Sequence, residues 1–198
     1  FEGYSKAIEA IGAHFLRKEG KRPGISVKLS ALHPRLCAAQ EAQCVPDLIA
    51  KLTQLCRRAA ALNINLTVDA EESERLETSL KIIAPIIQDI SLSGWDGFGL
   101  AVQAYGKRCV PLVENLVALA QQNNRRIQIR LVKGAYWDSE IKRAQIKGLE
   151  DYPVFTRKIH TDISYLACAQ ILLRGREWVY PMFGTHNAYT VQAVLEMA

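Results

Sequence analysis

The sequence predicts an α/β fold of the TIM-like (β/α)8 barrel type, of which about five strand–helix units are present. Two observations lead to this fold class. Short β-prone runs alternate with segments of helical periodicity, as in parallel sheets and barrels. Each run is also apolar on one face and polar or small on the other, whereas strands of a doubly wound sheet are apolar almost throughout. The one-sided strands therefore favour a barrel.

Five β-prone runs follow the period of two that strands require. In the first, Ile25, Val27 and Leu29 share one face, while Ser26 and Lys28 share the other. The same alternation places the apolar side chains of the later runs toward a helix layer. The runs cover residues 25–29, 64–69, 98–103, 127–132 and 179–183.

Helices are expected in four of the intervening segments. The segment 47–62 carries leucines at helical spacing, and Pro85 is expected to kink or divide the helix over 73–90. Two further helices are expected over 110–122 and 157–173, the second ending before Gly175.

Polar side chains stand near the C-terminal ends of four strands, where interiors of barrels are usually filled by branched apolar residues. They are Lys28, Asp69, Gln103 and Arg130. Burying them unpaired would cost several kcal/mol each. One interpretation is a mutual network in which Asp69 pairs with Arg130 or Lys28. A bound polar ligand at the catalytic end of a barrel explains four such positions better.

The block RLVKGAYWDSE, residues 130–140, combines cations, small residues and aromatic rings. Small residues let a backbone approach a ligand closely, and flat rings beside positive charge suit a planar, phosphorylated cofactor such as a flavin. The residues concerned are Arg130, Lys133, Gly134, Ala135, Tyr136 and Trp137.

Composition and charge limit the function classes. With 25 Lys and Arg against 20 Asp and Glu, the basic residues are scattered, so a nucleic-acid surface is disfavoured and an anionic small ligand is compatible. The five cysteines form no CxxC pair and no zinc pattern, so free thiols in a reducing cytoplasm and no metal are expected. No apolar run is long enough to span a membrane.

Six motifs make the chain resemble one family, the proline dehydrogenase domain of bacterial bifunctional proline utilization A. The resemblance covers nearly the whole chain, with the motifs in the family's order. They are VKLSALHP (27–34), DAEE (69–72), QAYGKR (103–108), RLVKGAYWDSEIK (130–142), YPVFTRKIHTDISYLACA (152–169) and FGTHNAYT (183–190).

The resemblance implies noncovalently bound FAD at the strand C-termini and oxidation of L-proline to Δ1-pyrroline-5-carboxylate. The ring carbon next to nitrogen would give a hydride to flavin N5, and a membrane quinone would accept the electrons. It also implies an aldehyde dehydrogenase module elsewhere in the parent chain. A cytoplasmic protein with peripheral contact to the inner membrane is expected.

The resemblance also implies substrate and catalytic roles. Lys28 would hold the proline carboxylate, and Asp69 would lie against the flavin and the substrate amine. Tyr136 would pack on the proline ring, and Arg130 would approach flavin N5, where negative charge accumulates.

The remaining matched residues would bind the cofactor. Gln103 would hydrogen-bond the isoalloxazine edge, and Trp137 would pack on the adenosine portion. Thr156 and Lys158, at a helix start, suit the pyrophosphate. The other expected contacts are the backbone of Val132, Lys133 and Gly134, with Ala135 beside them, and Thr185, His186 and Asn187.

Residues 1–198 are therefore expected to be a partial barrel domain, because a complete barrel has eight strands and about 250 residues. This segment alone is expected to be inactive or poorly folded. Two alternatives stay open: a Schiff-base aldolase with Lys28 or Lys133 as nucleophile, and an inactive barrel fragment acting as a scaffold. The family's paired arginines in the last barrel helix do not occur in this sequence.

Overall fold

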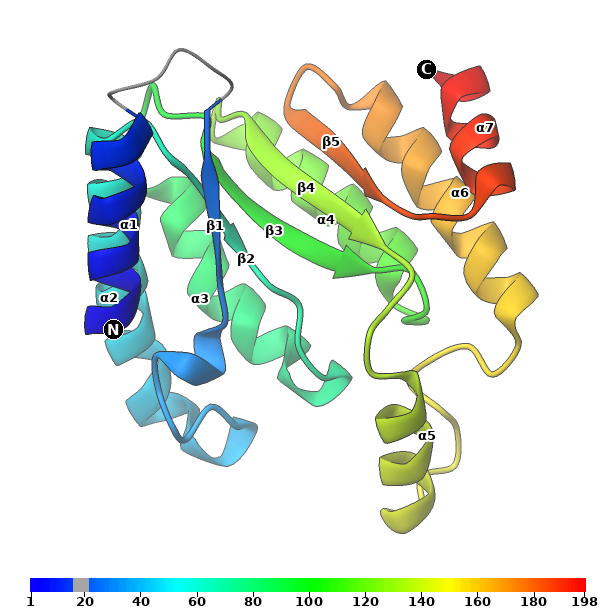
Figure 1. Cartoon of the computed structure of the whole chain (residues 1–198). Coiled ribbons are helices and arrows are strands. Elements are labelled where there is room, and N and C mark those ends of the chain that lie inside the picture. Colours follow the sequence, from blue (N-terminus) through cyan, green and yellow to red (C-terminus); the bar gives the residue numbers. More distant parts are fainter. Residues whose placement is uncertain (16–21) are drawn as a thin grey trace. The chain divides into compact units, whose positions relative to one another are not determined.

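The computed structural model describes residues 1–15 and 22–198 (Figure 1). Five strands follow one another in a sheet of order β1-β2-β3-β4-β5 and alternate with helices along the chain. The chain forms two compact units. Unit 1 consists of Phe1–Asp69 and Glu74–Leu100, and unit 2 of Ala70–Ser73 and Ala101–Ala198.

Unit 1 holds two complete strands and the first half of a third. β1 pairs in parallel with β2, and β2 pairs in parallel with the start of β3 through Leu66 and Phe98. The elements are α1 (Glu2–Phe15), β1 (Gly24–Val27), α2 (Glu41–Ala61), β2 (Asn65–Val68), α3 (Leu76–Gln88) and β3 (Phe98–Gln103).

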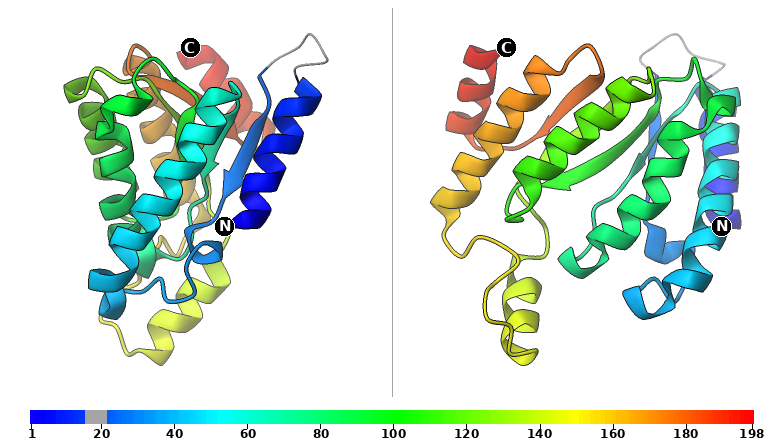
Figure 2. Two further views of the ribbon diagram at one scale, coloured as in Figure 1. Left: turned by 90° about the vertical axis from the view of Figure 1, so that its left-hand side faces the viewer. Right: turned by 180° about the vertical axis from the view of Figure 1, so that it is seen from behind.

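The core of unit 1 forms where α2 and α3 pack side by side (Figure 2). Each helix contributes apolar residues at spacings of three or four, which is the periodicity of one buried helix face. The buried residues are Leu48, Leu52, Leu55, Cys56 and Ala59 from α2, and Ile82, Ile83, Ile86 and Ile87 from α3. Glu41, at the start of α2, accepts hydrogen bonds from Thr78 and Lys81 of α3.

Unit 2 holds the second half of β3 and the remaining elements. They are α4 (Cys109–Gln122), β4 (Ile127–Val132), α5 (Trp137–Ile146), α6 (Lys158–Arg174), β5 (Val179–Gly184) and α7 (Ala188–Met197). β4 pairs in parallel with β5 from Ile127 to Val132. α4 lies against α6 (Figure 2). The buried thiols of Cys109 on α4 and Cys168 on α6 are 3.5 Å apart.

Several predicted boundaries are wrong. β1 ends at Val27, and Lys28 leads into a 3-10 turn over Leu29–Ala31. β2 ends one residue before Asp69, and β5 extends to Gly184. Strand endings shift because the chain turns where ladder hydrogen bonds stop, and periodicity alone does not mark that point.

Two helices also differ from expectation. α2 begins at Glu41 rather than at residue 47. α3 begins at Leu76, after a 3-10 turn over Ser73–Arg75, and runs without interruption through Pro85 to Gln88. A proline removes one backbone hydrogen bond, and the buried isoleucines on both sides of it keep the helix packed.

The helix α5 was not predicted, because residues 130–140 appeared to continue from a strand into a loop. Its only buried residues are Glu140 and Ala144, so it lacks the apolar stripe by which a surface helix is detected. Figure 1 shows α5 extending away from the C-terminal end of β4. None of the helices in the described residues combines the length and apolar character that a bilayer crossing needs.

Candidate functional site

Lys28 and Asp69 follow neighbouring strands of unit 1. The backbone N–H of Asp69 donates to the carbonyl of Val27 (2.9 Å), which joins the two strand ends. The backbone N–H of Lys28 donates to the hydroxyl of Tyr4 (3.1 Å) on α1. Lys28 is exposed and Asp69 is half-buried, so both reach the surface at this edge of unit 1.

The ends of β3 and β4 hold their following loops together in unit 2. The N–H of Ala104 donates to Val132 (2.8 Å), and the N–H of Tyr105 donates to Lys133 (2.7 Å). Arg130 lies in β4 between the fully buried Ile129 and Leu131 and is itself half-buried. The predicted alternation therefore holds at the C-terminal end of β4, whereas Gln128, on the same face as Arg130, is buried.

Gln103, the last residue of β3, joins two loops through its side-chain amide. Its Nε2 donates to the carbonyl of Glu71 (2.9 Å), and its Oε1 accepts from the N–H of Ala135 (3.0 Å). Both ends of the amide therefore engage the protein. The loop after β4 is held by Gln103 at the point where a cofactor edge was expected.

The backbone at Gly134 requires glycine. Its φ is +142°, and a Cβ there would lie 2.3 Å from Cδ2 of Tyr105. Tyr105 is buried, and its hydroxyl has no hydrogen-bond partner among the described residues. Burial, together with the negative charge of Glu140, raises the pKa of Tyr105 above its ordinary value. The uncharged ring of Tyr105 therefore packs against the loop after β4 at Gly134.

A cavity of about 430 Å³ opens in unit 2 beside this loop. It is large enough for part of a nucleotide-sized ligand. Its lining joins the loop after β4, the start of α5 and the start of α6. The lining residues are Tyr105, Lys133, Gly134, Trp137, Asp138, Thr156, Lys158 and Thr161. Five predicted cofactor residues are thus brought together from two distant parts of the sequence.

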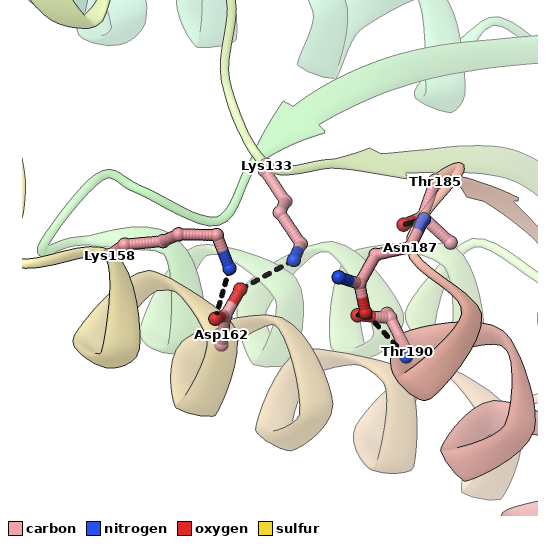
Figure 3. A network of polar contacts seen from close by, with 6 residues as sticks. All are labelled: Lys133, Lys158, Asp162, Thr185, Asn187 and Thr190. Atoms are coloured by element: carbon pink, nitrogen blue, oxygen red, sulfur yellow. Dashed lines mark hydrogen bonds and ion pairs between the residues drawn. The ribbon is translucent and has the colours of Figure 1, made fainter.

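The two lysines of the cavity converge on one carboxylate (Figure 3). Nζ of Lys133 is 2.5 Å from Oδ1 of Asp162, and Nζ of Lys158 is 2.6 Å from Oδ2. Burial opposes ionisation of Asp162, but the hydrogen bonds from both ammonium groups outweigh it and lower the pKa of this carboxyl. Asp162 was missed by the sequence analysis, although its spacing of four from Lys158 is that of a helical ion pair.

Tyr136 and Trp137 mark the change from loop to helix. Tyr136 is half-buried and immediately precedes α5, which Trp137 begins. The indole N–H of Trp137 donates to the carbonyl of Phe155 (2.9 Å), and 41% of this residue remains exposed. A fixed, partly exposed ring at the edge of a cavity provides a surface for stacking.

Thr185, His186 and Asn187 connect β5 to α7. Oδ1 of Asn187 caps the helix by accepting from the N–H of Thr190 (3.0 Å) and from its hydroxyl (3.1 Å) (Figure 3). The hydroxyl of Thr185 accepts from the N–H of Asn187 (3.1 Å). His186 is exposed. Asn187 therefore has a structural role as a helix cap, which was not predicted.

Glu140 is the second residue that the sequence analysis missed. Only 1% of it is exposed, and its two oxygens accept from the N–H and the hydroxyl of Ser73, each at 2.6 Å. A glutamate in the first turn of a mostly exposed helix gives no sequence signal of burial.

The chemistry of the cavity fits a dinucleotide such as FAD. Directed donors for phosphate come from Thr156 and Lys158 at the start of α6, and Trp137 offers an aromatic surface. The carboxylates of Asp138 and Asp162 offset the two lysine charges, so affinity for an anion depends on directed donors rather than on net charge. Among the described residues, no group of three side chains is arranged to hold a metal ion.

Comparison with known proteins agrees with this geometry. The family model for proline dehydrogenase matches residues 1–198. The bifunctional protein PutA of Salmonella typhimurium is 51% identical over 196 residues, which are 98% of this chain and 15% of that protein. PutA of Rhizobium meliloti is 49% identical over 198 residues, covering 100% of this chain and 16% of that protein. The chain thus spans about a sixth of these relatives.

Solved structures give the same result for the fold. A variant of proline utilization A from Bradyrhizobium japonicum has a TM-score of 0.94 and 53% identity, covering 100% of this chain and 20% of that one. Proline utilization A from Bdellovibrio bacteriovorus, inactivated by N-propargylglycine, has a TM-score of 0.93 and 26% identity. The match covers 98% of this chain and 22% of that one. The predicted α/β fold of the TIM-like barrel type is confirmed, and the chain belongs to the proline dehydrogenase family.

Proposed function

We propose that this chain is part of an FAD-dependent proline dehydrogenase, which oxidises L-proline to Δ1-pyrroline-5-carboxylate in proline catabolism. The observation that carries the proposal is the cavity beside the loop after β4, in which Lys133, Trp137 and Lys158 are brought together. Membership of the proline dehydrogenase family supports the substrate.

The residues of the cavity would hold the cofactor. Thr156 and Lys158 would bind the pyrophosphate, Trp137 would pack on the adenosine portion, and the backbone from Val132 to Gly134, with Ala135, would lie along the ribityl chain. Thr185, His186 and Asn187 would add contacts from the β5–α7 connection. When bound, FAD supplies the acceptor for a hydride.

The substrate would be held by side chains at the strand ends. The Lys28 ammonium would bind the proline carboxylate, and Asp69 would hydrogen-bond the substrate amine. Tyr136 would pack on the ring, and Arg130 would stabilise the negative charge that develops during hydride transfer. Gln103 would act mainly by holding the loop through Ala135, because its amide is already engaged on both sides.

The wider setting follows from the same proposal. The electron acceptor would be a membrane quinone, reached by a cytoplasmic protein through peripheral contact with the membrane. Residues 1–198 would be a partial barrel domain of a chain that also carries an aldehyde dehydrogenase module. An aldolase role for Lys133 is disfavoured, because an ammonium held 2.5 Å from the Asp162 carboxylate is a poor nucleophile.

The test uses the full-length gene product that contains residues 1–198. It is expected to purify with FAD, and anaerobic L-proline is expected to bleach its flavin absorbance. Lys28→Met should raise the proline concentration for half-bleaching at least about tenfold without changing flavin content. Lys6→Met, an exposed lysine of α1, is the matched control.

Two results would contradict the proposal. One is bound flavin that proline does not bleach, and the other is a flavin-free protein trapped by borohydride with a carbonyl substrate. N-propargylglycine offers an independent check, because it inactivates the Bdellovibrio relative. It is expected to abolish proline oxidation here as well.

A further inference from the structure

Glu140 is a buried carboxylate that the proposed reaction does not use. It lies on α5, most of whose residues are exposed, yet only 1% of Glu140 is accessible. Burying a carboxylate is unfavourable unless hydrogen bonds replace its water. Both of its oxygens accept from Ser73, a residue of another segment.

The backbone N–H, the hydroxyl and the carbonyl of Ser73 each form a hydrogen bond. Its N–H donates to Oε1 of Glu140 and its hydroxyl to Oε2, each at 2.6 Å. Its carbonyl accepts from the Arg108 guanidinium at 2.9 Å. Hydrogen bonds to a charged acceptor are the stronger kind, and two to one carboxylate fix orientation as well as distance.

The residues just before Ser73 are held in the same way. The carbonyl of Glu71 accepts from Gln103, and the carboxylate of Glu72 is 3.8 Å from the Arg143 guanidinium of α5. None of the residues from Ala70 to Ser73 is buried, so apolar packing does not fix this stretch. Its conformation therefore depends on polar contacts, among them the two from Ser73 to Glu140 at 2.6 Å.

We propose that Glu140 is a positioning residue, which holds the segment Ala70–Ser73 and so fixes the backbone that leaves Asp69. This inference rests on the proposed function, in which Asp69 meets the substrate amine. Glu140 would touch neither substrate nor cofactor. It would act through Asp69, which a double-mutant cycle can detect.

The first measurement is amide hydrogen exchange in the full-length protein. Glu140→Ala is expected to speed exchange of the Ser73 amide at least about tenfold, because its acceptor is gone. Glu140→Gln retains an acceptor for this amide and should restore most of the protection. Glu150→Ala, the same change at an exposed site, is the matched control. Unchanged protection in Glu140→Ala would overturn the proposal.

The second measurement is the kinetics of proline oxidation. Glu140→Ala is expected to lower kcat/KM about 30-fold, and Glu140→Gln less than about threefold. In an Asp69→Ala background, Glu140→Ala should change the residual rate less than about twofold. Additive losses in the two backgrounds would show that Glu140 does not act through Asp69.

If Glu140→Ala does not fold, Ser73→Ala still tests the proposal. Ser73→Ala removes only the hydroxyl contact and is expected to lower kcat/KM about threefold, with the same lack of additivity toward Asp69→Ala. If the wild-type protein does not oxidise proline, the proposed function fails, whereas hydrogen exchange still decides whether Glu140 holds Ser73.

Discussion

Nζ of Lys133 lies 2.5 Å from Oδ1 of Asp162, which joins the loop after β4 to the second turn of α6. Lys133 and Asp162 are 25% and 23% exposed at their side chains, so this ion pair is partly shielded from solvent. Asp162 also forms an ion pair with Lys158, four residues earlier in the chain. One carboxylate therefore organises both ammonium groups of the candidate cofactor cavity.

Asp162→Asn is expected to reduce the free energy of unfolding by about 1–2 kcal/mol at pH 7. The folded-state pKa of Asp162 is below its unfolded value, so its stabilisation is complete above the unfolded pKa, about 4. It disappears as pH falls through the folded pKa. Urea unfolding of both proteins between neutral and acidic pH tests this. A stability difference that grows on acidification would contradict it.

The two lysines should contribute unequally to stability. Lys133 is 25% exposed and bridges two elements, whereas Lys158 is 72% exposed and pairs within its helix. Exposed helical pairs contribute about 0.3–0.5 kcal/mol. We therefore expect Lys133→Met to reduce the unfolding free energy by about 1–2 kcal/mol and Lys158→Met by less than about 0.5 kcal/mol.

Thermal unfolding of the full-length protein measures both losses, with Lys142→Met on the exposed face of α5 as control. Equal losses for the two variants would mean that burial does not distinguish the pairs. Both variants are also expected to weaken FAD binding, since each removes a donor from the cavity lining.

Residue patterns predicted much of the fold and part of the site. The alternation in β4 predicted that Arg130 lies on the face opposite Ile129 and Leu131, and in the structure it is half-buried between these two buried residues. Motif matching identified five residues that line one cavity. Strand periodicity is a local property, so it can be read from one segment at a time.

The residues that escaped prediction depend on contacts between distant segments. Glu140 is buried because Ser73 reaches it, and Asp162 is central because Lys133 reaches it across 29 positions. Gln103 was expected to face a ligand, but its amide bridges Glu71 and Ala135. Polar contacts between distant segments produce no periodic residue pattern in either segment, so they cannot be predicted from local sequence.

Gln103→Glu is expected to reduce the unfolding free energy by about 2 kcal/mol at pH 7. The new carboxylate can still accept from Ala135, but it can no longer donate to the Glu71 carbonyl and faces that oxygen with negative charge. Protonation restores a donor, so the deficit should shrink as pH falls toward about 4. Gln170→Glu on the exposed face of α6 is the control for added charge. A pH-independent deficit would contradict the bridge.

Gly134→Ala should be far more harmful than Gly148→Ala. Both glycines have positive φ, +142° and +60°, but nothing lies within 4 Å of a Cβ built at Gly148. A left-handed conformation alone costs an alanine about 1–2 kcal/mol, which we expect for Gly148→Ala. Gly134→Ala adds the overlap with the Tyr105 ring and should exceed about 3 kcal/mol.

A double mutant separates the two causes at Gly134. Removing the ring in Tyr105→Ala opens the space that the new Cβ needs but leaves the backbone strain in place. The Gly134→Ala penalty should therefore fall by about 1–2 kcal/mol in the Tyr105→Ala background, as contacting residues couple by this amount. Chemical denaturation of the four proteins of the cycle measures it. Additive losses would mean that the overlap is relieved by movement of the loop, and FAD affinity would then fall with Gly134→Ala whether or not the ring is present.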